Sequence, residues 1–191
     1  IDDLIVYHTQ DQYTIVVNAA TAEKDLAWIQ TQAQHFDVEI NRRTDLCILA
    51  LQGPQAQTLA KEHLNHLGEY PPTPFSCTRQ QDTIIASTGY TGESGYEFIL
   101  PKDIAIDSWK RLIKAKVTPC GLGARDSLRL EAGLNLYGTD MDETVSPLES
   151  NLKWTVQFDN HDFIGKEAIL MQQEQGIRTQ LVGVVLEGRG V

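Results

Sequence analysis

The sequence predicts an α+β fold made mainly of antiparallel sheets with packed helices. Segments that alternate apolar and polar residues are mixed with segments that carry apolar residues at helical spacing, without the regular rhythm of a parallel sheet. A glycine-rich turn joins two apolar runs in STGYTGESGYEFIL, residues 87–100, and this pattern predicts a hairpin. A chain of 191 residues is long enough for one large domain or two small ones.

The chain opens with two expected strands and a helix. Residues 1–8 and 12–18 are rich in β-branched and aromatic side chains, and a polar turn at residues 9–11 separates them. Thr21 can cap a helix that runs to about residue 34. The inward face of this helix is expected to be Ala22, Leu26, Ile29 and Ala33.

Two strands and a second helix are expected next. Residues 36–40 and 46–51 are short apolar runs, which predict strands. Pro54 suits a first helical turn, because an amide hydrogen at that position has no partner within the helix. The helix is expected to bury Leu59, Leu64 and Leu67.

The middle of the chain contains the hairpin. Residues 75–79 and 83–87 predict short strands, and the second of these continues into the hairpin turn. Asp103 can cap the helix that follows the returning strand. The buried stripe of this helix is expected to be Ala105, Trp109 and Leu112.

The last part of the chain is predicted in less detail. A helix is expected at residues 124–132 after Gly-Leu-Gly, and another at residues 166–173. Residues 154–158 and 180–186 predict strands. We expect domain breaks near residue 150 and between residues 37 and 45.

Composition limits the function. The formal net charge of −10 argues against nonspecific binding to nucleic acid, because such binding depends on lysine and arginine. No apolar run approaches the roughly 18 residues of a membrane span, so no membrane association is expected. Three widely spaced cysteines without a CxxC pair favour a reducing compartment. The chain opens and closes beside strand-like runs, so we expect it to be part of a longer protein.

Asp2 and Asp3 are the first candidate site residues. Neighbouring residues of a strand point to opposite faces, so one of the two carboxylates is expected to turn toward the interior. There it could act as a base or orient a nucleophile. The alternative is a strand end in solvent.

Tyr90 and Glu97 flank the hairpin turn. A carboxylate can accept two neighbouring N–H donors from the edge of a ligand, and a tyrosine ring offers a flat face for stacking. The alternative is a hairpin tip in solvent. Glu93, within the turn, is expected to be solvated.

Arg125, Asn18 and Trp154 are weaker candidates. Arg125 lies at the start of an expected helix, where a cation opposes the helix dipole, so a nearby anionic group is expected. Asn18 could contact a ligand or cap a turn. Trp154 could line a ligand site or lie in the core. His63 and His66 lack further ligands, so no metal site is predicted.

Several motifs in order carry a resemblance to a known family. They are IDDLIVY, VVNAA, LQGPQAQ, TGYTGESGYE, CGLGARDSLRLEAGLNLYGTDMDE and PLESNLKW. Together they closely resemble the aminomethyltransferase (T-protein) family of the glycine cleavage system, over essentially the whole chain. The resemblance implies an enzyme that uses tetrahydrofolate and meets the lipoylated H-protein. Such an enzyme takes the aminomethyl group from the lipoyl arm, releases ammonia and forms 5,10-methylenetetrahydrofolate.

The resemblance also implies roles for the candidate residues. Asp3 would lie beside the folate nitrogen that attacks the methylene carbon, as the catalytic residue. Glu97 would accept the donors of the pterin edge. The other folate-binding residues would be Asn18, Tyr90, Arg125 and Trp154.

The family fold has three domains around a central folate site. By resemblance, residues 1–40 would end the second domain's sequence, residues 41–150 would form the main folate-binding portion, and residues 151–191 would begin an incomplete β-rich third domain. The family continues before IDDL and after LEGRGV, so activity of this chain alone is not expected. The expected location is the bacterial cytoplasm, or the mitochondrial matrix if the source is eukaryotic.

Other classes stay open. One is a non-catalytic folate-binding scaffold, although such relatives carry a KGCYxGQE-like motif where this chain has TGYTGESGYE. Another is the folate domain of a flavin-dependent sarcosine or dimethylglycine oxidoreductase. The third is an α+β domain in which all of these polar residues are structural.

Overall fold

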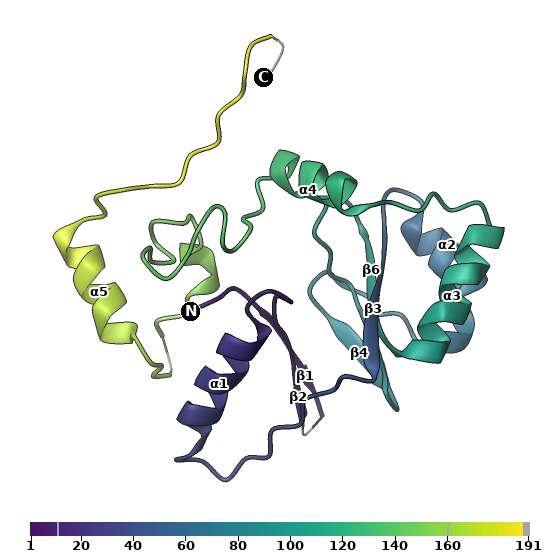
Figure 1. Ribbon diagram of the computed structural model, residues 1–191, viewed down its shortest axis with the longest axis horizontal. Coiled ribbons are helices and arrows are strands. Elements are labelled where there is room, and N and C mark those ends of the chain that lie inside the picture. The colour runs from purple at the N-terminus through teal and green to yellow at the C-terminus, as the bar shows by residue number, and fades with distance from the viewer. Residues whose placement is uncertain (11, 160, 189–191) are drawn as a thin grey trace. The chain divides into compact units, whose positions relative to one another are not determined.

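The computed structural model describes residues 1–10, 12–159 and 161–188. The chain divides into two compact units, and each is described by itself. The larger unit is Leu4–Leu134, and the smaller unit combines Ile1–Asp3 with Asn135–Val191. Figure 1 labels the α-helices of both units and most strands of the larger one.

The larger unit contains two antiparallel sheets and four α-helices in the part that the structure describes. The hairpin β1–β2 forms one sheet, and the other has the strand order β3-β6-β5-β4. The strands are β1 (Ile5–Thr9), β2 (Gln12–Val16), β3 (Leu46–Gln52), β4 (Cys77–Gln80), β5 (Thr83–Ala86) and β6 (Gly95–Pro101). The helices are α1 (Ala22–Ala33), α2 (Ala56–His63), the 3-10 helix η1 (Asn65–Leu67), α3 (Lys102–Lys114) and α4 (Leu122–Glu131). This mixture confirms the predicted fold class.

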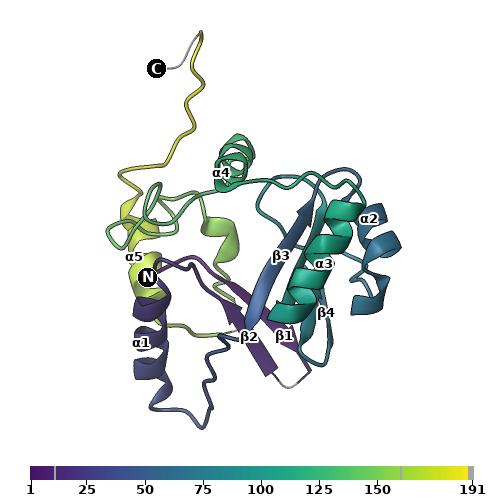
Figure 2. The ribbon, with the colours of Figure 1, turned by 45° about the vertical axis from the view of Figure 1, so that its right-hand side comes forward.

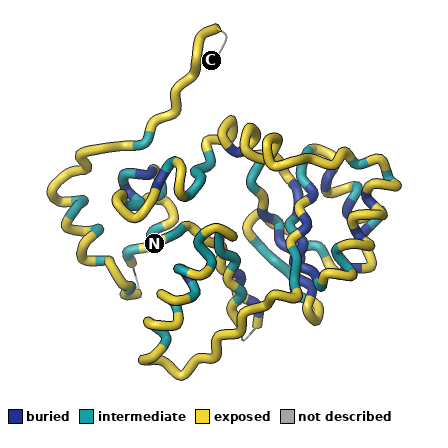
Figure 3. Tube along the Cα trace, viewed as in Figure 1, coloured by how far each residue is buried: buried dark blue, intermediate teal, exposed yellow. Residues whose placement is uncertain are grey.

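β6 is buried on both faces, because its alternating side chains enter two different apolar clusters. Tyr96, Phe98 and Leu100 face α2 and α3, and they pack with residues of β3 and β5. Ile99 points to the opposite face and packs with Tyr7 of β1 and with β5. Figure 2 shows α3 lying along the sheet, and Figure 3 shows the buried residues concentrated on these strands.

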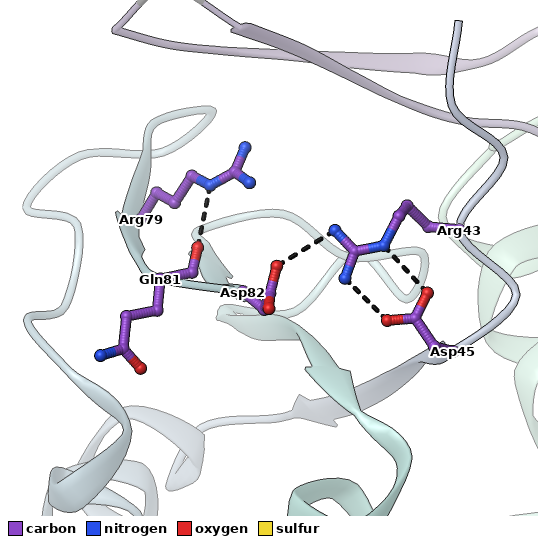
Figure 4. A network of polar contacts seen from close by, with 5 residues as sticks. All are labelled: Arg43, Asp45, Arg79, Gln81 and Asp82. Atoms are coloured by element: carbon purple, nitrogen blue, oxygen red, sulfur yellow. Dashed lines mark hydrogen bonds and ion pairs between the residues drawn. The ribbon is translucent and has the colours of Figure 1, made fainter.

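The register of the sheet defines two ends. At one end Gln52 of β3 pairs with Gly95 of β6, and at the other end Leu46 pairs with Pro101. The second end is closed by ion pairs (Figure 4): Arg43 contacts Asp45 at 2.7 Å and Asp82 at 3.1 Å. The Arg43 guanidinium lowers the pKa of Asp45 to about 2 through its hydrogen bonds. These contacts tie the segment before β3 to the turn between β4 and β5.

The smaller unit contains little regular structure among its described residues. It has the 3-10 helix η2 (Lys153–Thr155), the helix α5 (Lys166–Gln175) and a parallel bridge between Tyr137 and Met141. Neither of the described sheets of the molecule closes into a barrel. The predicted domain bounds at residues 40 and 150 stay a prediction.

Three predicted strands are wrong. Residues 36–40, 154–158 and 180–186 are all described, and none of them forms a strand. A strand requires a partner for its backbone hydrogen bonds, and alternation of side chains does not supply one. Val38 and Val184 are 61% and 79% exposed, so these side chains do not enter a core formed by the described residues.

Several details of the predicted helices also differ. Trp109 is 45% exposed, whereas Leu112 of the same predicted stripe is buried. Asp103 lies in the first turn of α3, and the capping position belongs to Pro101. Pro54 precedes α2, which begins at Ala56. The strand predicted at residues 1–8 begins only at Ile5.

Cys47, Cys77 and Cys120 are free thiols. In the described ranges, no helix is both long and apolar enough to cross a membrane. Those ranges also hold no cluster of three or more side chains that could bind a metal ion.

Candidate functional site

The hairpin turn at residues 87–94 needs its glycines because it packs closely against neighbouring segments. Gly92 has φ +75°, and a Cβ there would lie 2.8 Å from Cβ of Ala132 at the end of α4. A Cβ on Gly95 would lie 2.3 Å from the backbone oxygen of Leu51. Side chains at these positions would push the turn away from α4 and β3. Gly92 and Gly95 therefore allow the turn and the start of β6 to lie close to α4 and β3.

Glu97 is held at this end of the sheet by a hydrogen bond. It lies on β6 opposite Ala86, the last residue of β5. The hydroxyl of Thr88, two residues further along, donates to Oε2 of Glu97 at 2.6 Å. Glu97 itself is half-buried, so its carboxylate is partly accessible. The distance of 2.6 Å between the Thr88 hydroxyl and Oε2 is typical of a hydrogen bond to a charged oxygen.

Tyr7 extends this contact into a chain of hydroxyl groups. Its hydroxyl oxygen lies 3.1 Å from the hydroxyl oxygen of Thr88. Thr88 has one hydroxyl hydrogen, which it gives to Glu97, so Tyr7 must donate to Thr88. Burial raises the pKa of Tyr7, the bond with Thr88 lowers it, and the Glu97 charge raises it further, with a net increase. Tyr7 therefore keeps the proton that it donates.

Gln52, at the end of β3, joins both strands of the hairpin. Its Nε2 donates to the backbone oxygen of Thr88 at 3.0 Å and to that of Tyr96 at 3.2 Å. Its Oε1 accepts from the hydroxyl of Thr91 at 3.5 Å. A single amide side chain thus holds the start of the turn, its middle and the strand that carries Glu97.

Tyr90 and Arg125 meet beside the turn. The guanidinium carbon of Arg125 lies 4.4 Å from the centre of the Tyr90 ring. The face of an aromatic ring attracts cations, which offsets part of the cost of a cation near a helix N-terminus. The structure therefore places a ring beside Arg125 where the sequence predicted an anionic group. Asp126, its neighbour on α4, pairs with Arg129 at 2.9 Å, as the i, i+3 spacing predicts.

Asn18 also belongs to the larger unit. It follows β2 by two residues, and its backbone oxygen accepts from the amide and the hydroxyl of Thr21 at 3.3 and 3.2 Å. Asn18 thus forms the turn that leads into α1. Its side chain is half-buried.

Asp3 and Trp154 belong to the smaller unit. Asp3 is exposed and precedes β1, so the argument from alternating strand faces does not apply to it. Its amide donates to Oδ1 of Asp2 at 2.9 Å. Trp154 lies in η2 and is 73% exposed, which excludes the interpretation as a core residue. The structure thus brings Tyr90, Glu97 and Arg125 to one region of the larger unit.

Tyr7, Gln52 and Thr88 were missed by the sequence analysis. Tyr7 lies in a strand, Gln52 lies at a strand end and Thr88 precedes a glycine, and all three are ordinary positions for these residues. A signal did exist for Thr88, because a threonine beside a turn can reach a carboxylate two positions into the returning strand. For Tyr7 and Gln52 the contacts span 81 and 36 residues, beyond what local patterns reveal.

Comparison with known proteins identifies the class of this protein. The chain belongs to the GCVT N-terminal domain family, whose profile matches residues 1–160. It is similar to a solved structure, the glycine cleavage system aminomethyltransferase T from Bartonella henselae, with 34% sequence identity and a TM-score of 0.84. The match covers 92% of this chain and 50% of that one. The chain therefore spans about half the length of this relative.

Proposed function

We propose that this chain is the folate-binding part of an aminomethyltransferase of the glycine cleavage system. The protein transfers the methylene group of the aminomethyl-lipoyl arm of H-protein to tetrahydrofolate and releases ammonia. The family match and the Bartonella henselae relative support this proposal. The observation that carries it is the Glu97 carboxylate, held by Thr88 at 2.6 Å beside the turn that bears Tyr90.

The chemistry of this carboxylate suits a pterin. A carboxylate has about four lone-pair positions, and the bond from Thr88 uses one of them. The pterin edge presents two neighbouring N–H donors, which the remaining positions can accept. Tyr90 offers a ring face for a flat heterocycle, and Arg125, at 4.4 Å from that ring, offers a cation for the anionic part of folate.

The remaining residues complete the assignment. Asp3 orients the attacking nitrogen and stabilises positive charge on the methylene carbon, as an exposed carboxylate can do when a substrate covers it. Asn18 contributes a polar contact. Trp154, which is 73% exposed, offers a second aromatic surface. When bound, tetrahydrofolate supplies the nucleophilic nitrogen that accepts the one-carbon group.

The bacterial cytoplasm is the proposed location, or the mitochondrial matrix for a eukaryotic source. The free thiols of Cys47, Cys77 and Cys120 support it, because both compartments are reducing.

Calorimetric titration of tetrahydrofolate tests the binding assignment. The titration is applied to the 191-residue chain and to the intact protein. By intact protein we mean a chain that includes these residues and is as long as the Bartonella henselae relative. In the intact protein, Glu97→Gln is expected to raise Kd about tenfold to hundredfold, because the new amide replaces one acceptor with a donor. The matched control is Glu93→Gln in the exposed turn, which should leave Kd unchanged. Equal Kd values for wild type and Glu97→Gln would exclude the pterin clamp.

Ammonia release tests the catalytic assignment. In the intact protein with H-protein present, Asp3→Asn is expected to lower kcat about 10²- to 10⁴-fold, as the loss of a positioned acid or base does. The neighbouring Asp2→Asn is the matched control and should retain the rate. If Asp2→Asn lowers kcat more than Asp3→Asn does, the catalytic role belongs to Asp2.

A further inference from the structure

We propose that Thr88 is a positioning residue that aims the Glu97 carboxylate at its ligand, with Tyr7 and Gln52 holding Thr88 in place. This inference rests on the proposed function, because the ligand edge that Glu97 would meet is that of the pterin. It assigns a role in binding to three residues that the family resemblance did not suggest.

The hydroxyl chain selects one carboxylate oxygen. Thr88 donates to Oε2 of Glu97 at 2.6 Å, and Tyr7 donates in turn to Thr88 at 3.1 Å. A donated bond from Tyr7 polarises the Thr88 hydroxyl and strengthens its bond to the carboxylate. Glu97 is thereby held in one rotamer, with Oε1 available to a ligand donor.

Gln52 fixes the backbone at both ends of this contact. Its amide group donates to the backbone oxygen of Thr88 at 3.0 Å and to that of Tyr96, the residue before Glu97, at 3.2 Å. The Thr88 hydroxyl and the Glu97 carboxylate therefore keep their separation even though Thr88 lies beyond the end of β5. The same side chain reaches Thr91 in the turn that carries Tyr90.

The arrangement lowers the cost of ligand binding. A free glutamate side chain loses rotamer freedom when it binds, and this loss weakens affinity. Here the hydrogen bond from Thr88 restricts the rotamer of Glu97. Thr88 is 9% exposed and Tyr7 is 6% exposed, so both are buried, whereas Glu97 is half-buried and partly accessible. Their effect on a ligand must pass through Glu97.

Thr88→Val in the intact protein tests the proposal, because it removes the hydroxyl and keeps the shape. The Kd for tetrahydrofolate, measured by calorimetry, is expected to rise about tenfold to hundredfold, as for the loss of a hydrogen bond to a charged group. Thr88→Ser keeps a hydroxyl and should restore most of the affinity. Thr83→Val is the matched control, since Thr83 is equally buried, at 8%, at the other end of β5.

A double variant separates positioning from a purely structural role. If Thr88 acts through Glu97, Thr88→Val should add little to the loss caused by Glu97→Gln. Tyr7→Phe gives a second measurement if Thr88→Val does not fold, and it should raise Kd by a few fold. Additive losses in the double variant would contradict the proposal.

The outcomes also separate this inference from the proposed function. Wild-type protein that does not bind tetrahydrofolate would overturn both. If wild type binds and Glu97→Gln weakens binding, unchanged Kd values for Thr88→Val and Tyr7→Phe would overturn the positioning role alone. A weakened Thr88→Val rescued by Thr88→Ser would confirm it.

Discussion

The larger unit and the smaller unit of the chain are stabilised internally by different kinds of contact. In the larger unit, apolar clusters lie on both faces of β6, and Phe98 and Leu100 are fully buried. Among the described residues of the smaller unit, the buried apolar side chains are Met141 and Leu148. Figure 3 shows this contrast as dark strands in the larger unit and a mostly exposed trace in the smaller one.

In the smaller unit, the carboxylate of Glu149 connects three segments of the chain. It accepts hydrogen bonds from the Ser146 amide at 2.9 Å, the Gln172 side chain at 3.0 Å and the Thr179 hydroxyl at 2.6 Å. These donors lie in a loop, in α5 and in the segment after α5. The hydrogen bonds, led by that of Thr179, lower the pKa of Glu149 to about 2. The burial of apolar side chains does not depend on pH, whereas the hydrogen bonds to the Glu149 carboxylate depend on its negative charge.

The largest expected effect is the loss of a core side chain in the larger unit. Phe98→Ala should lower the free energy of unfolding by about 3–5 kcal/mol, because it removes apolar contacts and leaves a cavity between β6, α2 and α3. Denaturant unfolding measures it. Phe75→Ala is the matched control, since Phe75 is 81% exposed, and it should change stability by less than about 0.5 kcal/mol. Similar losses for both variants would contradict the assignment of the core to β6.

A smaller effect, confined to the smaller unit, is expected at Glu149. Its pKa is lower when folded than when unfolded, so its contribution to stability is complete above the unfolded pKa of about 4.3. That contribution should be lost as pH falls from about 4.3 toward 2. This loss can be measured by hydrogen exchange at the Leu181 amide, which donates to the Glu149 backbone oxygen at 2.8 Å.

Glu149→Gln tests whether the carboxylate of Glu149 causes this pH dependence. In this variant the Leu181 amide should exchange faster at neutral pH. Its protection from exchange should not change between about pH 4.3 and 2, because residue 149 then has no carboxylate to protonate. Glu174→Gln, at an exposed carboxylate of α5, is the control and should behave as wild type. Acid-dependent exchange that persists in Glu149→Gln would assign the pH response to another group.

Local patterns predicted most elements of the larger unit. The expected strand at residues 46–51 is β3, and the expected helix at residues 21–34 contains α1. Leu49 and Leu51 of β3 enter the core, whereas the apolar face of α1 is only half-buried and Asp25 is its buried residue. The alternation of Tyr96, Phe98 and Leu100 identified one buried face of β6. It did not reveal that Ile99 is also buried, because that depends on β1 packing on the opposite face.

The same patterns failed where no partner was present. Residues 180–186 alternate like a strand, yet they pair with no other strand in the described part of the chain. Trp109 has helical spacing with Leu112 but remains 45% exposed, because α3 buries a narrower stripe than the spacing allows. Burial depends on what lies opposite a face, and a local window of sequence does not contain that information.

The fold class, the family and the hairpin that carries both Tyr90 and Glu97 could be predicted from the sequence, because they follow from periodicity, glycine positions and motif order. Thr88 is close to Glu97 in the chain, but Gln52 and Tyr7 come from distant segments. Their hydrogen bonds form only once β3 pairs with β6 and β1 packs on a face of that sheet. A hydrogen bond requires atoms about 3 Å apart, and long-range packing alone creates that proximity.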